Sequence, residues 1–247
     1  MIEGDASFTA DLYAEQVYGA DWRDKVSQEA TKGGAEPDSK LPQFLLNDAA
    51  FDYGDCKAFV KSLYEDGGWK AVNAAFVDPP DTTEQILHLD KYKSHELANT
   101  GPPPDLSTRL TDWQLIDSSQ FGEFDVFNYA VSLTGDASAA VVAAAGWGSG
   151  WSSAYRNKSD PSRVIVQLSF GWDTQQDLLE FAVVYDRILQ SLGATVQPVG
   201  AKGNVRWSAN GQFGAASLIE NTSRIEMRIA SDEAGLKDAI ADWKDFQ

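Results

Sequence analysis

A run of three prolines, residues 102–104, separates two stretches of the chain whose apolar residues follow different periods. Each proline fixes φ and lacks a backbone N–H donor, so the run favours extended polyproline geometry over a helix. We therefore predict a boundary there, with a first part formed by residues 1–104 and a second part formed by residues 105–247.

Before the prolines, apolar residues recur at the spacing of an amphipathic helix, once over residues 8–13 and again over residues 59–64. Glycines and a proline within residues 33–37 predict a loop, and the glycine pair 67–68 is typical of a helix end. Asp81 or Thr82 predicts an N-cap for a short helix over residues 83–87. The first part is therefore predicted to be mainly helical.

After the prolines, strand and helix patterns alternate. A β-branched run predicts a strand over residues 163–170, and Asp173 or Thr174 then predicts the N-cap of a helix over residues 175–192. Further strands are predicted at 113–116, 205–208, 213–219 and 223–229, with a turn at 220–222, a glycine-rich turn at 148–150 and helices at 137–145 and 233–246. The fold class that follows is α+β, in which a mainly helical N-terminal half precedes a small antiparallel or mixed sheet with packed helices.

The charge of the chain is strongly acidic, with 37 Asp and Glu against 20 Lys and Arg and a formal net charge of −17. Such a chain repels phosphates and anionic lipid surfaces, which excludes nucleic acid as a main partner. A halophilic source is the favoured explanation, with an ordinary acidic protein as the alternative, and either predicts stability that rises with salt. No window has the roughly 18 apolar residues of a membrane-spanning helix, so the chain is expected to be soluble as written.

No complete catalytic or metal-binding motif occurs in the sequence. The signatures HExxH, GxSxG and the glycine-rich phosphate loops are absent, and His88 and His95 are the only histidines. Cys56 is the only cysteine, which excludes an internal disulfide and a thiolate metal cluster. Acidic residues are too abundant for any pair of them to indicate a glycosidase.

Several segments, in order along the chain, resemble a known family. They are Glu3-Gly4-Asp5-Ala6, Phe59-Val60, Gly67-Gly68-Trp69, Asp78-Pro79-Pro80, Thr83 to His88, Gly122-Glu123-Phe124, Ala143 to Gly148 and Trp172-Asp173-Thr174. Together they resemble the C-terminal two-thirds of a family of zincin-like, gluzincin-type metallopeptidase-like proteins from archaea and bacteria. The haloarchaeal branch of that family includes surface proteins, which agrees with the acidity.

The resemblance implies roles for four residues. In that family an HExxH helix lies upstream, and the glutamate that matches Glu3 is the third zinc ligand. Asp5 would not bind the zinc itself but would contact one of the ligand residues and orient it. Glu84 and His88 would lie near the cleft, where a histidine can stabilise an oxyanion, although an ordinary helix start at Thr83 explains Glu84 equally well. The family's Pro-Glu after the histidine is replaced by residues 89–90, Leu-Asp.

The missing HExxH helix predicts an N-terminally truncated zinc metallopeptidase-like protein without hydrolytic activity as this chain alone, because one carboxylate neither holds zinc tightly nor activates its water. Zinc is expected only in complete relatives. The alternatives are a catalytically silent surface or interaction domain of a halophilic archaeon, with a protein or peptide partner, and a whole enzyme of another class. A cell-surface or extracellular location would follow if a missing N-terminus carried an export signal.

Overall fold

The computed structural model describes residues 1–26, 40–200, 203–219 and 222–246. Contacts divide the chain into two compact units, residues 1–96 and residues 97–247, which we call the first and the second unit. The loop predicted at 33–37 lies outside the described residues, as do two of the three residues of the turn predicted at 220–222.

The division between the units falls earlier than the boundary at residue 104 that the prolines predict. The backbone N–H of Asn99 donates to the carbonyl oxygen of Gly148 at 2.8 Å, and the indole Nε1 of Trp151 donates to the carbonyl oxygen of Thr100 at 3.0 Å. The segment before the prolines is therefore bonded to the sheet of the second unit, a pairing that the local sequence does not reveal.

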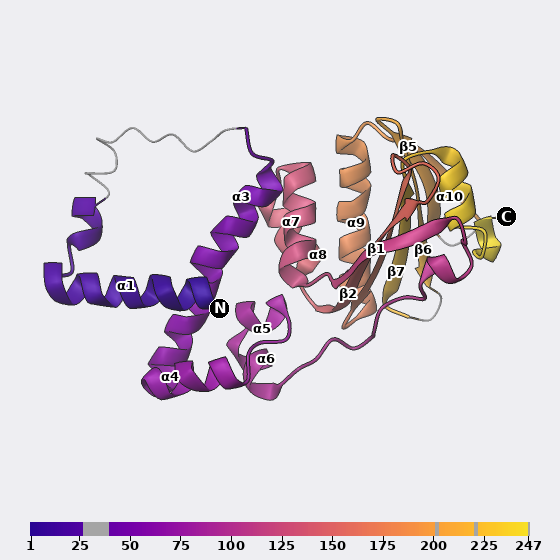
Figure 1. The fold of residues 1–247 in the computed structure, drawn as a ribbon. Coiled ribbons are helices and arrows are strands. Elements are labelled where there is room, and N and C mark those ends of the chain that lie inside the picture. Colours follow the sequence, from indigo (N-terminus) through magenta and orange to yellow (C-terminus); the bar gives the residue numbers. More distant parts are fainter. Residues whose placement is uncertain (27–39, 201–202, 220–221, 247) are drawn as a thin grey trace. The chain divides into compact units, whose positions relative to one another are not determined.

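The first unit is helical, as predicted (Figure 1). Its elements are α1 (Ile2–Tyr18), α3 (Gln43–Ala50), the π-helical turn η1 (Phe51–Asp55), α4 (Cys56–Val77), α5 (Thr83–Leu87) and α6 (Leu89–Ser94). Phe8 of α1 packs against Phe59 and Leu63 of α4 in a small apolar core. The two helices approach closely because Gly4 has no side chain, since a Cβ there would lie 2.3 Å from the carbonyl oxygen of Cys56.

Two local signals in the first unit are confirmed. Gly67 and Gly68 interrupt α4 with non-helical backbone, and Gly68 has a φ of 63°, a conformation that favours glycine. Thr82 caps α5, because its hydroxyl accepts a hydrogen bond from the backbone N–H of Gln85 at 3.2 Å.

The second unit is built on an antiparallel sheet, which confirms the α+β class (Figure 1). Its elements are η2 (Leu106–Thr108), β1 (Trp113–Gln120), α7 (Glu123–Thr134), α8 (Ala137–Ala144), β2 (Trp147–Asn157), β3 (Val164–Trp172), α9 (Gln175–Ser191), β4 (Thr195–Val199), β5 (Asn204–Ala209), β6 (Gln212–Ile219), β7 (Arg224–Ala230), α10 (Glu233–Ala239) and η3 (Lys244–Phe246). The seven strands are ordered β1-β2-β3-β7-β6-β5-β4.

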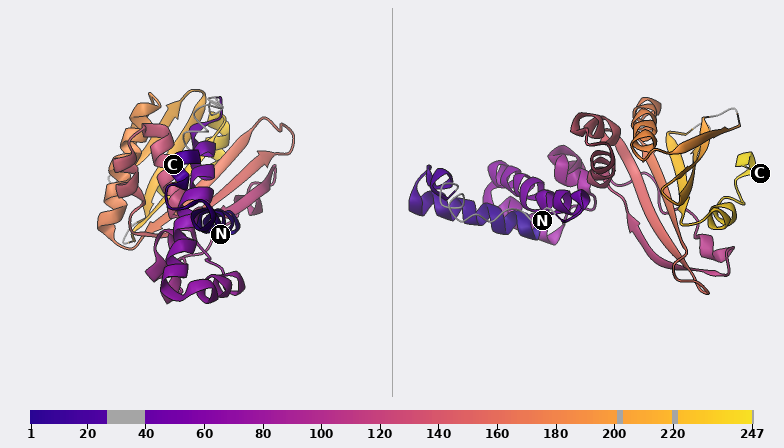
Figure 2. Two further views of the ribbon diagram at one scale, coloured as in Figure 1. Left: turned by 90° about the vertical axis from the view of Figure 1, so that its left-hand side faces the viewer. Right: turned by 90° about the horizontal axis from the view of Figure 1, so that it is seen from above.

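Helices cover both faces of this sheet, α9 on one and α10 on the other (Figure 2). The α9 face carries the larger core, in which Phe181 of α9 contacts Phe170 and Trp172 of β3. Thr174 is the N-cap of α9, one of the two residues predicted for that position, and it forms a reciprocal capping box with Asp177. On the α10 face, Leu236 and Ile240 pack against a smaller core.

Two local expectations are wrong, and one strand was not predicted. Residues 148–150 lie in β2 and form no turn; Gly150 fits there because a Cβ would lie 2.0 Å from the carbonyl oxygen of Phe121. Strand β4 was not predicted, because its exposed residues and Pro198 are typical of a loop. The last helix ends at Ala239 rather than at Phe246. Its last carbonyl oxygens accept hydrogen bonds from arginine side chains.

Candidate functional site

Two neighbouring rows of side chains cross the whole sheet on the α10 face. The first is mainly apolar and consists of Leu115, Tyr155, Ile165, Ala230, Phe213, Ser208 and Thr195, in cross-strand order. The second is polar and consists of Ser118, Ser153, Gln167, Arg228, Ala215, Arg206 and Gln197. The rows are two residues apart on every strand except β1, where a register shift between Leu115 and Asp117 makes the spacing three, so their side chains point to the same face. Helix α10 packs on the apolar row.

The N-terminus of α10 is fixed by Asp232. Its carboxylate accepts a hydrogen bond from the backbone N–H of Gly235 at 2.8 Å, which caps the helix. The same carboxylate accepts two hydrogen bonds from the guanidinium of Arg163, at 2.8 and 2.9 Å. The hydrogen bond from Arg163 is the main reason why the pKa of Asp232 lies below its ordinary value.

Two substitutions of Asp232 distinguish the stability contributed by the helix cap from that contributed by the ion pair. Asp232→Ala removes both and is expected to lower the free energy of unfolding by about 1–2 kcal/mol. Asp232→Asn is the matched control, because it keeps a capping oxygen and loses only the partly exposed ion pair, which is worth about 0.2–1 kcal/mol. Urea unfolding followed by tryptophan fluorescence measures both, and equal losses in the two variants would contradict the capping role.

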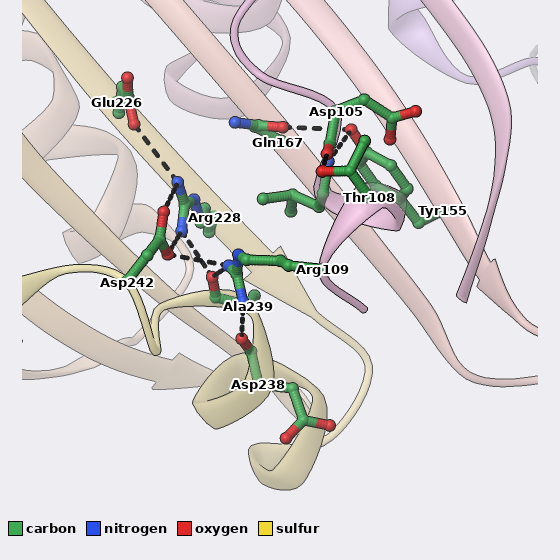
Figure 3. Close-up of polar contacts among 11 residues, drawn as sticks. Asp105, Thr108, Arg109, Tyr155, Gln167, Glu226, Arg228, Asp238, Ala239 and Asp242 are labelled. Carbon is green, nitrogen blue, oxygen red and sulfur yellow. Dashed lines mark hydrogen bonds and ion pairs between the residues drawn. The ribbon is translucent and has the colours of Figure 1, made fainter. Parts of the chain in front are cut away.

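The C-terminus of α10 is held by two arginines, Arg109 and Arg228, which we call the arginine cap (Figure 3). Arg109 donates to the carbonyl oxygen of Asp238 at 2.8 Å, and both guanidiniums donate to the carbonyl oxygen of Ala239. The last carbonyls of a helix have no partner within it and carry partial negative charge. The arginine cap satisfies them, which explains why the helix ends here and does not continue to residue 246.

The carboxylate of Asp242 joins the arginine cap from the segment after the helix (Figure 3). It accepts hydrogen bonds from Arg109 at 2.8 Å and from both terminal nitrogens of Arg228, one of them at 3.2 Å. The ring of Trp243 covers the Arg228 guanidinium, with 4.4 Å between the Cζ atom and the ring centroid. Burial raises the pKa of Asp242, but the hydrogen bond and charge of Arg228 outweigh it, so the pKa lies below its ordinary value of 3.8.

The lowered pKa of Asp242 predicts a pH dependence of stability. A carboxyl whose pKa is lower in the folded state stabilises the fold above its unfolded pKa and loses that contribution as the pH falls through the folded pKa. The stability difference between the natural chain and Asp242→Asn is therefore expected to be full at pH 6 and to shrink below roughly pH 4. Urea unfolding of both proteins across this range checks it, and a pH-independent difference would contradict it.

A pocket of about 820 Å³ lies between α10 and the strands β4, β5 and β6, and we call it the α10 pocket. Its lining includes members of both rows on β4 and β5. Its lining residues are Thr195, Gln197, Arg206, Trp207, Ser208, Phe213, Glu233, Ala234, Leu236, Lys237, Ile240, Ala241 and Phe246. Phe213, Leu236, Ile240 and Phe246 belong to the small core or pack against it, so one wall of the pocket is apolar.

Two cationic side chains line the α10 pocket. Arg206 is half-buried, donates to the carbonyl oxygen of Phe246 and lies over its ring, with 5.6 Å between Cζ and the ring centroid. The Nε of Arg206 is buried and has no hydrogen-bond partner among the described residues. Lys237 is exposed on α10 and has no ion-pair partner in the described part of the chain. Against these two cations, the described lining residues include one acid, Glu233.

The residues singled out by the resemblance lie in the first unit. Glu3 is exposed on α1, and its hydrogen bond with Tyr53 is the main cause that raises the pKa of the Tyr53 hydroxyl. Asp5 is half-buried, and its Oδ1 has no hydrogen-bond partner among the described residues. Within the described residues, neither carboxylate belongs to a group of three side chains that bring metal-ligand atoms together.

Glu84 and His88 differ in their surroundings. Glu84 is buried on α5, where Lys91 lies 2.6 Å from its carboxylate and neutralises it. His88 is exposed between α5 and α6, as predicted for a residue at the end of the helix over residues 83–87. His95 is exposed as well, and its Nδ1 lies 3.6 Å from the carboxylate of Asp78.

Roles for Arg109, Arg206 and Arg228 were not predictable from motifs, because none of these arginines belongs to one. Alternation along β5 and β7 was a usable signal, since Arg206 and Arg228 each lie between apolar residues of a strand and so point away from the larger core. Only the pairing of the strands brings them into one row.

Comparisons with known proteins add one family. In the described residues, no helix combines the length and the apolar character needed to cross a membrane. No curated protein matches the chain. A family model, Domain of unknown function (DUF8575), matches residues 108–239, which run from η2 to the last residue of α10 and so include the whole sheet. This match covers more than half of the chain, and the chain therefore belongs to the DUF8575 family.

Proposed function

We propose that this chain is a binding protein for a small organic ligand and that the α10 pocket of the second unit is its binding site. The observation that carries the proposal is the pocket itself, whose volume of about 820 Å³ lies within the range of roughly 300–1,000 Å³ typical of small-molecule sites. This proposal differs from the surface or interaction domain considered from the sequence, for which a protein or peptide was the expected partner.

The composition of the lining supports binding over catalysis. Its ionisable side chains are Arg206, Glu233 and Lys237, together with hydroxyls such as Ser208. Histidine and cysteine, which often serve as general base and as thiol nucleophile, are not among the described lining residues. Apolar walls with a few polar groups at the rim are what orient and hold a ligand.

The structure also explains how the pocket keeps its shape. Asp232 fixes one end of α10 and the arginine cap fixes the other. The wall that α10 contributes is therefore anchored at both termini, which lowers the cost of ordering it when a ligand binds.

A neutral fluorescent probe, N-phenyl-naphthylamine, tests the proposal by its emission in an apolar environment. We expect saturable binding at one site by the natural chain and loss of binding in Ala234→Trp, whose indole fills the pocket from α10. Ala137→Trp is the matched control, because Ala137 is exposed at the start of α8 and does not line the pocket. Absence of saturable binding, or equal binding by both variants, would overturn the proposal.

The zinc peptidase interpretation stays a prediction. The described residues around Glu3 do not fit a zinc site by themselves, because tight zinc binding needs three or four ligands and no such set forms around Glu3 or Asp5 among them. We expect a calorimetric zinc titration to give the same result for the natural chain and for Glu3→Gln. Tight one-to-one binding that the variant loses would instead support the interpretation.

A further inference from the structure

We infer that the α10 pocket selects a small organic acid, that is, a carboxylate carried on an apolar skeleton. The inference rests on the proposed function and adds the chemical class of the ligand. Its basis is the arrangement of Arg206 and Lys237 beside the apolar wall of the pocket.

Charge complementarity is the first argument. The chain has a net charge of −17, yet the lining of this pocket has two cations and one acid. Glu233 and Lys237 are four residues apart on α10, but no ion pair joins them in the described structure. The ammonium of Lys237 is therefore available at the rim of the pocket, where an anionic ligand reaches it without displacing a partner.

The geometry of Arg206 is the second argument. Its guanidinium is held in place by the carbonyl oxygen and the ring of Phe246. A carboxylate oxygen is the acceptor that forms the strongest hydrogen bonds with a guanidinium. The arginine is thus oriented before a ligand binds.

The position of Arg206 within the sheet gives the third argument. In the polar row, Arg206 pairs with Ala215 on one side and with Gln197 of the edge strand on the other. Gln197 also lines the pocket and offers an amide beside the guanidinium. The carboxylate would face Arg206, and the apolar skeleton would lie against Phe213 and Leu236.

Three probes with one ring system test the charge class: naphthoate, its neutral amide naphthamide and the cationic naphthylmethylamine. Calorimetric titrations at one constant salt concentration are expected to show that naphthoate binds about tenfold tighter than naphthamide, and that the cation binds weakest. Equal affinities for all three would overturn the charge selection and leave the proposed function standing. Absence of binding by all three would contradict the proposed function itself.

Substitutions of Lys237 and Arg206 test whether these two side chains cause the preference for naphthoate over naphthamide. Lys237→Met and Arg206→Met are each expected to weaken naphthoate binding severalfold while changing naphthamide binding by less than about twofold. Arg156→Met is the control, because Arg156 is exposed on β2 and does not line the pocket. If Arg206→Met fails to fold, Lys237→Met still decides, because Lys237 is exposed and unpaired in the described structure. Unchanged naphthoate affinity in Lys237→Met would overturn the inference.

Discussion

Arg228→Met is expected to lower the free energy of unfolding by about 3 kcal/mol, near the lower end of the range of about 3–5 kcal/mol for breaking a buried ion pair. The Arg228 side chain is 4% exposed, and its loss leaves the carbonyl oxygen of Ala239 and the carboxylate of Asp242 with fewer donors. The lower end applies because the side chain of Asp242 is 43% exposed and is partly solvated.

Arg109→Met is the matched control for this prediction. Arg109 contacts the same carbonyl and the same carboxylate, but its side chain is 30% exposed, so its removal is expected to cost no more than about 1 kcal/mol. Urea unfolding measures both variants. A loss below 1 kcal/mol for Arg228→Met would show that the arginine cap does not anchor α10, and would remove the physical basis for a preformed pocket wall.

Phe181→Ala is expected to destabilise the second unit by about 3–5 kcal/mol, because it leaves a cavity in the larger core. Phe181 is fully buried, and its ring centroid lies 4.6 Å from that of Trp172 and 5.8 Å from that of Phe170. Close-packed rings of this kind do not fill the cavity unless the sheet also moves.

Val183→Ala on the same helix provides the comparison. Val183 is 57% exposed, so its truncation is expected to change the stability by no more than about 0.5 kcal/mol. Thermal unfolding followed by near-ultraviolet circular dichroism reports both variants through the buried tryptophans. Similar melting temperatures for Phe181→Ala and the natural chain would show that α9 is not essential to the larger core.

The binding experiments and the stability experiments test different parts of the same arrangement. If the arginine cap anchors α10, Arg228→Met weakens the binding of N-phenyl-naphthylamine as well as the fold. A variant that loses stability but keeps probe affinity would show that the pocket does not depend on the C-terminal anchor of α10. The structural role of the cap and the proposed function are therefore separable by measurement.

Much of the fold was predictable because its signals are local. The helix over residues 175–192 and its cap at Thr174 follow from apolar periodicity and from side-chain oxygens placed at the first turn. The strands at β3, β5, β6 and β7 follow from short alternating runs. The capped helix after Thr82 follows in the same way. Each of these predictions depends only on residues that lie close together in the sequence.

The α10 pocket, in contrast, was not predictable from local signals. Strand β4 has an exposed, proline-containing sequence, and it becomes a strand only because β5 offers it hydrogen-bonding partners. The end of α10 at Ala239 depends on Arg109, which is 130 residues away in the chain. Residues 3 and 5, which the resemblance emphasised, offer carboxylates from one helix and do not assemble a site among the described residues.

The sequence by itself determined the acidity, the α+β class and the helix and strand segments with strong periodicity, because composition and short-range spacing are properties of the chain. The tertiary structure alone decided that Arg206, Ala215 and Arg228 share one row of the sheet, that two arginines end α10, and that a pocket with two cations opens beside it. The physical reason is strand pairing, which brings distant residues together in a register that no local pattern specifies.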